Sequence, residues 1–276
     1  MSGTDRIYST LDMDAPEFVS FAGYHAAIFT HRRPESPTAN EDGAALIPYY
    51  DQSGVAVVAD GLGGSSAGER ASAMALEELQ RSIAQARETG EPLRSAILTG
   101  IENANDSIQK LGIGAMTTLA VAEIDQESIR TYHVGDSEIL VLGGRGKVKL
   151  RTVSHSPVGY GVEAGFIDAA EAMHHEDRHI VNNVVGETEM RSEIGSPIPL
   201  APRDTIVLAS DGLIDNLHAD EIAAFLCHGR FRYSVTQVAS AAYQRMTSPQ
   251  PEQPSKLDDL TMIVLRRAAT LGKKSY

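Results

Sequence analysis

The sequence predicts an α+β fold in which two antiparallel β-sheets lie between two layers of helices, giving a four-layer α-β-β-α sandwich. Most of the expected strands are short β-branched runs that follow one another directly, as in antiparallel meanders. The long helical patterns are paired, with one pair in the first half of the chain and one near its C-terminal end. Because strands and helices do not alternate one by one, a doubly wound parallel sheet is disfavoured.

The N-terminal half is expected to hold the first strands and the first helix pair. Strands are expected over residues 18–30, 44–48 and 55–59. Residues 65–87 have apolar side chains at helical spacing, at Ala71, Met74, Ala75, Leu79 and Ile83. Gly90 interrupts this pattern, and a second helix is framed by Pro92 and Gly112. Its expected buried face consists of Ile97, Ile101, Ala104, Ile108 and Leu111.

The C-terminal half is expected to supply most of the remaining strands and the second helix pair. Three or four strands separated by turn signals are expected over residues 117–124, 129–134, 139–142 and 148–153. A flap-like stretch at about residues 155–180 follows. Beyond it we expect a strand at 205–210, helices at 220–227 and 234–246, and a last strand at 260–267.

The chain of 276 residues is expected to form one domain, because no linker-like segment divides it. We expect residues 1–17 to be an N-terminal extension, residues 18–267 the domain, and residues 268–276 a tail. The extension lacks the basic and apolar regions of a signal peptide, and no run reaches the ~18 apolar residues of a membrane span. The single cysteine, Cys227, excludes internal disulfides and is typical of a reducing cytosol. These features predict a cytoplasmic protein without a membrane partner.

The net charge of −13 argues against a nucleic-acid partner, because contacts of Lys and Arg with phosphate dominate such binding. Solubility alone could account for the acidic surface. Bound divalent cations could also match part of the charge. We expect both effects, since 37 acidic residues far exceed what a metal cluster needs.

Five acidic motifs are scattered along the chain, and most stand where an apolar run ends. They are Asn40-Glu41-Asp42, Asp60-Gly61-Leu62-Gly63-Gly64, Gly135-Asp136-Ser137, Ser210-Asp211-Gly212 and Asp258-Asp259-Leu260-Thr261. Carboxylates gathered from several strand ends would repel one another unless cations lay among them. Hard oxygen ligands of this kind suit Mg²⁺ or Mn²⁺. The motifs therefore predict a divalent-metal site.

The motif that begins at Asp60 resembles the DGxGG signature of the PP2C-type (PPM) metal-dependent protein phosphatases, and the other motifs fall in that family's order. Gly114-Ala115-Met116-Thr117-Thr118 resembles the family's strand entry after the first helix pair, and the stretch from His155 to Arg178 resembles the flap of its bacterial branch. The resemblance runs from about residue 20 to about residue 267. A single such motif would be a weak signal, but six in order at compatible spacings are specific.

The resemblance implies the same four-layer fold, with two or three Mn²⁺ or Mg²⁺ ions in a cleft at one edge of the sandwich. It implies that Asp60 bridges two ions, that the Gly61 carbonyl joins it, and that Asp211 and Asp258 are further ligands. These three carboxylates would be catalytic because the ions activate a water that attacks phosphorus. Asp136 would hold a third, weaker ion. Glu41 and Asp42 would act through metal-bound waters.

Each motif also has a plainer interpretation. Asp-Gly is a common turn pair, Asp211 could be a helix N-cap, and Asp136 could be a β-turn residue. Glu41 and Asp42 could be solvated loop residues, and so could Asp259, whose side chain should diverge from that of its neighbour in an extended chain.

Other residues give weaker evidence about the reaction. His133 is expected in the core, and His174, His175 and His179 of the flap-like stretch are expected at the surface. Eukaryotic relatives often place a proton-donating His where this chain has Leu62, so a metal-bound water would have to supply that proton. Glu138 stands where the family commonly has Arg, so the local charge differs. No Cys-x₅-Arg or Gly-x-Ser-x-Gly nucleophile motif is evident.

A phosphate dianion that approaches this many carboxylates needs positive charge beyond the metals, and a guanidinium offers a bidentate fork for it. The family usually supplies that Arg three or four residues before its Glu-Asp pair, where this chain has Pro37 and Thr38. Arg32 and Arg33 lie further back, and the intervening loop would have to bring one of them in. The alternative is a solvated basic turn.

We therefore expect a Mg/Mn-dependent phosphatase that hydrolyses phosphoserine and phosphothreonine in phosphoproteins, the substrates of a cognate Ser/Thr kinase. Two alternatives remain open. One is a regulatory phosphatase with a single dedicated partner, of the sigma-factor control type. The other is a catalytically silent binding module of the same fold.

Overall fold

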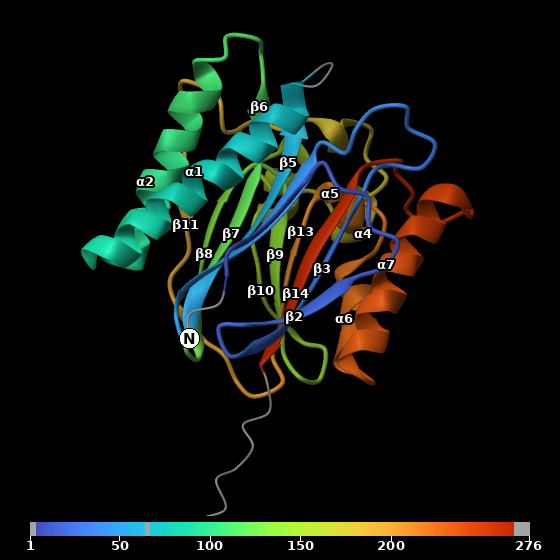
Figure 1. Ribbon diagram of the computed structural model, residues 1–276. Coiled ribbons are helices and arrows are strands. Elements are labelled where there is room, and N and C mark those ends of the chain that lie inside the picture. Colours follow the sequence, from blue (N-terminus) through green and yellow to red (C-terminus); the bar gives the residue numbers. More distant parts are fainter. Residues whose placement is uncertain (1–3, 64–66, 268–276) are drawn as a thin grey trace, which may run out of the picture.

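A computed structural model describes residues 4–63 and 67–267, and it shows two antiparallel sheets packed face to face between helices (Figure 1). One pair of long helices covers one sheet, and a second pair covers the other. The predicted four-layer α-β-β-α sandwich is confirmed. Gly64 of the predicted motif and the predicted tail, residues 268–276, lie outside the described residues.

The first sheet contains the strands that carry the N-terminal acidic motifs. Its order is β1 (Arg6–Ser9), β4 (Asp42–Tyr50), β5 (Ser53–Leu62), β7 (Leu119–Asp125), β8 (Ser128–Val134) and β11 (Glu193–Ile194). Two short strands lie off this path: β6 (Met116–Thr117) pairs with β5, and β12 (Ile198–Pro199) pairs with β8.

The second sheet contains the strands next to the C-terminal motifs. Its order is β10 (Val148–Arg151), β9 (Glu138–Leu142), β13 (Thr205–Ala209), β14 (Leu260–Arg267), β3 (Tyr24–His31) and β2 (Glu17–Phe21). Every strand pair in both sheets is antiparallel, and the inner faces of the sheets bury small and β-branched side chains such as Val58, Val141 and Ile263.

Two expected segments differ from the structure. Residues 18–30 form the hairpin β2–β3 rather than one strand, because Ala22 and Gly23 turn the chain with φ angles of 48° and 81°. Residues 1–17 were expected to precede the domain, yet β1 lies within them and pairs with β4, Arg6 opposite Leu46. A short run such as Arg6–Ser9 is too brief to show a strand period, so only the pairing partner reveals it.

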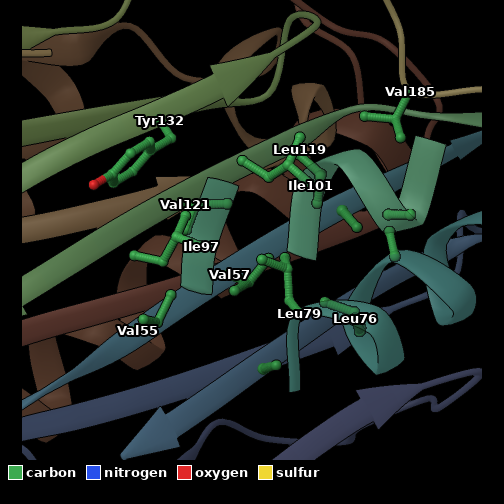
Figure 2. Close-up of a cluster of buried hydrophobic side chains, with 14 of the residues drawn as sticks. Val55, Val57, Leu76, Leu79, Ile97, Ile101, Leu119, Val121, Tyr132 and Val185 are labelled. Carbon is green, nitrogen blue, oxygen red and sulfur yellow. The ribbon is translucent and has the colours of Figure 1, made fainter. Parts of the chain in front are cut away.

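The first helix pair packs on the outer face of the first sheet. Helices α1 (Ala67–Thr89) and α2 (Leu93–Gln109) turn Leu76, Leu79, Ile97 and Ile101 toward Val57 and the neighbouring strands, and all of these side chains are buried (Figure 2). Each such burial stabilises the fold by roughly 1.5–3 kcal/mol. On the other sheet lie α6 (Ala219–Cys227) and α7 (Phe231–Thr247).

The flap-like stretch forms three short helical segments between β10 and β11. They are α3 (Pro157–Glu163), α4 (Ala169–Ala172) and the 3₁₀ segment η1 (Glu176–His179). Ser156 caps α3 by accepting a hydrogen bond from the Gly159 amide, and Asp168 caps α4 in the same way from Ala170. Across the described residues, no helix has the length and apolar character needed to cross a membrane.

Candidate metal centre

Strand pairing in the first sheet brings two of the acidic motifs together. Asp42 begins β4 and Asp60 lies near the end of β5, and the two residues are directly opposite in the antiparallel register. The pairing is local, because only two residues, 51 and 52, separate these strands. The first two motifs therefore meet at one end of the sandwich.

Strand pairing in the second sheet brings two more motifs to that end. Ala209 at the end of β13 faces Met262 near the start of β14, so Ser210-Asp211 lies beside the Asp258-Asp259-Leu260 stretch. Asp211 opens the short helix α5 (Asp211–Ile214), directly after the strand. The Gly212 position requires glycine, since a Cβ there would lie 1.9 Å from the Asp259 carbonyl oxygen.

The carboxylates of the two sheets form one centre. Burial is the largest cause that raises the pKa of Asp60, and the further causes are the carboxylates of Asp42, Asp211, Asp258 and Asp136. Burial and the Asp258 carboxylate likewise raise the pKa of Asp211. Carboxylates raise one another's pKa in this way only when they lie close together. The structure thus assembles the four residues Asp60, Asp136, Asp211 and Asp258, which the sequence predicted as carboxylate ligands.

Hydroxyl groups lock the motifs to one another. Ser210 Oγ donates to Asp42 Oδ2 at 2.7 Å and accepts from the Thr261 amide at 3.0 Å, which ties three motifs together. Thr117 Oγ1 donates to the Asp60 carbonyl at 2.8 Å, and the Thr118 amide donates to the same oxygen at 2.8 Å. These bonds hold the backbone at Asp60 in place without using its carboxylate.

The donor set fits divalent cations. Asp42 Oδ1 and Asp211 Oδ1 are buried and accept no hydrogen bond from any described residue, whereas the buried Asp215 Oδ2 lies 3.3 Å from the Lys256 ammonium. A buried carboxylate oxygen without a partner costs about 1–3 kcal/mol or more, and hard cations such as Mg²⁺ and Mn²⁺ are the partners that prefer it. Burial and the neighbouring carboxylates also raise the pKa of Asp136 to about 6, although Lys256 opposes this shift.

Two of the plainer interpretations of the acidic pairs are excluded by the structure. Asp259 is not a solvated loop acid: it is 9% exposed and accepts hydrogen bonds from the amides of Arg33 and Glu41, each at 2.7 Å. Asp42 is 1% exposed, so its loop-solvation alternative is excluded. Asp258 and Asp259 do diverge as expected, and Asp259 fixes the neighbouring loop instead of facing water.

Gly61, whose carbonyl is expected to join Asp60 at a metal ion, also has a packing role. A Cβ on Gly61 would lie 2.2 Å from the Gly68 carbonyl oxygen and 2.6 Å from that of Glu41. Protein backbone therefore fills this space, and the glycine permits the first turn of α1 to pack against β5.

The two candidate arginines have different surroundings. Arg32 Nε pairs with Asp12 Oδ2 at 3.2 Å, and its amide donates to the same carboxylate. Arg33 Nε donates to Ser36 Oγ at 3.2 Å, and the Arg33 charge acts on the pKa of both Glu41 and Asp259. Asp12 therefore engages the Arg32 guanidinium, and Arg33 is the candidate whose charge acts on residues of the acidic centre.

The predicted charge difference at Glu138 is compensated by its neighbour. Arg151 on β10 donates to both Glu138 oxygens, at 2.7 Å from Nε and 2.9 Å from Nη2. Both residues line a cavity of about 150 Å³ together with Asp136 and Asp211. Residues of α3 and α4 line the same cavity, so the flap-like stretch lies beside the acidic centre.

Sequence reasoning missed two charged residues of the centre, Asp215 and Lys256. Asp215 follows α5 by one residue, and the Lys256 ammonium lies among Asp211, Asp215 and Asp258. Lys256 stands two residues before a predicted ligand, a signal that could have indicated it.

His133 is buried in β8 as predicted. Its hydrogen bond to the Val153 carbonyl and its stacking on His155 give it a packing role apart from this centre.

Comparisons with known proteins agree with this geometry. Residues 31–248 match the family model described as protein phosphatase 2C. A putative protein phosphatase 2C-type of Streptococcus pyogenes is 32% identical over 177 residues, which cover 62% of this chain and 71% of that protein. The S. agalactiae serine/threonine phosphatase structure has a TM-score of 0.76 at 26% identity and covers 89% of this chain and 100% of that one.

A further solved structure is the catalytic domain of the serine/threonine protein phosphatase PstP in complex with two manganese ions. It has a TM-score of 0.68 at 21% identity, with coverage of 88% of this chain and 97% of that chain. At this identity the likeness concerns the fold alone.

The fold and the clustered carboxylates define a metal-dependent protein phosphatase. The chain belongs to the protein phosphatase 2C family. The predicted family, fold class and enzyme class are thereby confirmed, and so is the predicted Mn²⁺ or Mg²⁺ dependence as a property of the family. Phosphoproteins are the substrates of this class of enzyme.

Proposed function

We propose that the acidic centre hydrolyses phosphoserine and phosphothreonine with two Mn²⁺ or Mg²⁺ ions. The observation that carries this proposal is the assembly of carboxylates from separate motifs, with buried oxygens that accept no hydrogen bond from the described residues. Asp60, Asp211 and Asp258 would be the carboxylate ligands, joined by the Gly61 carbonyl. When bound, such ions supply Lewis-acid polarisation of a phosphoryl group and activation of water at neutral pH.

The remaining residues orient the centre and the substrate. Ser210 donates a hydrogen bond to the Asp42 carboxylate, and Asp259 accepts one from the Glu41 amide. These contacts support our proposal that Glu41 and Asp42 would hold water molecules next to the ligands. Arg33 supplies positive charge beside the acidic centre, where a phosphate dianion would otherwise meet only carboxylates.

Turnover in the presence and absence of metal tests this function directly. We expect the chain to hydrolyse a phosphothreonine peptide and p-nitrophenyl phosphate with Mn²⁺, and to lose both activities in excess EDTA. Full turnover in EDTA would contradict a metal-dependent reaction. Absence of turnover with Mn²⁺, with the phosphopeptide still bound, would instead identify a silent binding module.

The physiological partners follow from the substrate class. We infer that the substrates are phosphoproteins made by a Ser/Thr kinase of the same cell. The lone Cys227 supports action in a reducing compartment, the cytoplasm. Dephosphorylation of a single protein in a phosphoproteome treated with the enzyme would indicate one dedicated partner, whereas many products would indicate a general phosphatase.

Arg33→Ala should raise KM for a phosphopeptide by about tenfold, the equivalent of ~1.4 kcal/mol, while kcat and the number of bound Mn²⁺ ions change little. Loss of a charge-assisted contact to the phosphate is the physical reason. Arg32→Ala is the matched control, since its guanidinium pairs with Asp12, and it should behave as the wild type. Equal KM values for all three proteins would show that Arg33 does not hold the phosphate.

The flap-like stretch should tune the choice of protein substrate. Phe166 is 88% exposed, which is unusual for so large an apolar side chain, and it lies three residues after the end of α3, whose Val162 and Glu163 line the cavity. Phe166→Ser should lower kcat/KM for a phosphoprotein several-fold and leave p-nitrophenyl phosphate turnover unchanged. Tyr50→Ser, at a 53% exposed tyrosine on β4, serves as the control. Equal losses on both substrates would mean that Phe166 supports the structure only.

A further inference from the structure

Lys256 places an ammonium group inside the acidic centre. Its Nζ lies 3.0 Å from Asp258 Oδ2 and 3.3 Å from Asp215 Oδ2, and it also pairs with Asp211 Oδ2. The side chain is only 18% exposed, whereas lysines ordinarily extend into solvent. The contact set of three carboxylates resembles the ligand set of a cation.

The backbone of Lys256 is held from both sides, so the position of the ammonium group is built into the fold. Asn216, which is completely buried, accepts a hydrogen bond from the Lys256 amide and donates one to the Lys256 carbonyl, both at 2.9 Å. The preceding residue, Ser255, donates from its hydroxyl to the Arg245 carbonyl and accepts at its own carbonyl from Arg178 Nη2. The loop before β14 is therefore anchored on the segment that follows α5, on α7 and on the flap-like stretch.

The ammonium group of Lys256 is matched by the charge around it, because its three ion-pair partners are all carboxylates. Asp136, the residue expected to hold a third metal ion, lines the same cavity as Asp211 and Asp215. A compact point charge with three donors can satisfy several carboxylates at once.

We infer that Lys256 occupies the place of a third cation, so that the centre binds two divalent ions and excludes a third. This inference rests on the proposed two-metal function. The ammonium already neutralises the carboxylates around Asp215, and a divalent ion beside it would be repelled by like charge. Asp211 and Asp258 retain unshared lone pairs, including the unpartnered Oδ1 of Asp211, for ions on the Asp60 side.

Counting bound Mn²⁺ tests the inference without reference to activity. In titrations followed by calorimetry and by the electron paramagnetic resonance signal of free Mn²⁺, the wild type should saturate at two ions per chain. Lys256→Met, of similar length and without charge, should saturate at three. The added Asp136→Asn substitution should return Lys256→Met to two ions. Lys149→Met is the matched control, since Lys149 pairs with Asp204 at 2.5 Å outside the centre, and it should bind two.

Three ions in the wild type, or two in both the wild type and Lys256→Met, would overturn the inference. Lys256→Gln provides a second neutral variant, and circular dichroism verifies that each variant is folded before titration. Two bound ions without phosphatase turnover would refute the proposed function and leave the role of Lys256 standing. A wild type that binds no Mn²⁺ at all would refute both.

Discussion

Asp60→Asn should reduce phosphatase turnover by more than about 100-fold, because Asp60 lies at the centre of the carboxylate cluster. Even mutation of a residue that only supports a metal ligand typically lowers metal affinity or activity by about 10–100-fold. The metal-free variant should remain folded and melt at or above the temperature of the metal-free wild type. The pKa of Asp60 is raised by burial and by four neighbouring carboxylates, so its ionised form opposes folding at neutral pH. Steady-state kinetics with Mn²⁺ and thermal melts in EDTA measure the two effects.

The sign of the stability effect follows from linkage. A carboxyl group whose pKa is higher in the folded than in the unfolded protein binds its proton more tightly when folded, so folding becomes less favourable as pH rises toward the folded pKa. Asparagine removes that cost. Asp106→Asn, on an exposed position of α2, is a control that should change neither turnover nor melting. An inactive Asp60→Asn protein that has also lost its fold would contradict the separation of catalysis from stability.

Mn²⁺ should raise the stability of the wild type strongly, because it binds only the assembled centre. At a hundredfold excess over Kd, binding adds ~2.7 kcal/mol, which corresponds to roughly 5–10 °C in Tm for a domain of this size. Relief of repulsion among Asp42, Asp60 and Asp211 is the physical source. Differential scanning fluorimetry with Mn²⁺ or with EDTA measures the shift.

The Asp60→Asn variant is the internal control for this stabilisation, and its shift with Mn²⁺ should be much smaller than that of the wild type. Superimposable melting curves of the wild type in Mn²⁺ and in EDTA would show that the carboxylate cluster does not gain its stability from metal.

Much of the fold could be predicted from local pattern. The helices over residues 67–89, 93–109, 219–227 and 231–247 lie where apolar spacing placed them, because amphipathic periodicity is a property of contiguous sequence. The hairpin β2–β3 and the edge strand β1 were missed. Short or continuous apolar runs contain no signal for where a chain turns or which strand it joins.

The candidate ligands could also be predicted, since Asp60, Asp136, Asp211 and Asp258 stand in motifs whose order along the chain is distinctive. The supporting residues could not. Asp259 is adjacent to a ligand and of the same type, yet its carboxylate faces the amides of Arg33 and Glu41. Which of these two neighbouring carboxylates faces the metal centre, and which one binds backbone amides, depends on the groups that lie on each side of the extended chain.

The sequence by itself determined the family, the layer order and the carboxylates available to bind metal, because these depend on residue type and spacing. Only the tertiary structure decided how charges pair. It assigned Arg32 to Asp12, left Arg33 near the centre, packed α1 onto Gly61, and set Lys256 among three carboxylates. Other contacts of the centre also join distant residues, such as the hydrogen bond from the Glu41 amide to the Asp259 carboxylate. Strand register and loop anchoring create these long-range contacts, and no local pattern in the sequence indicates them.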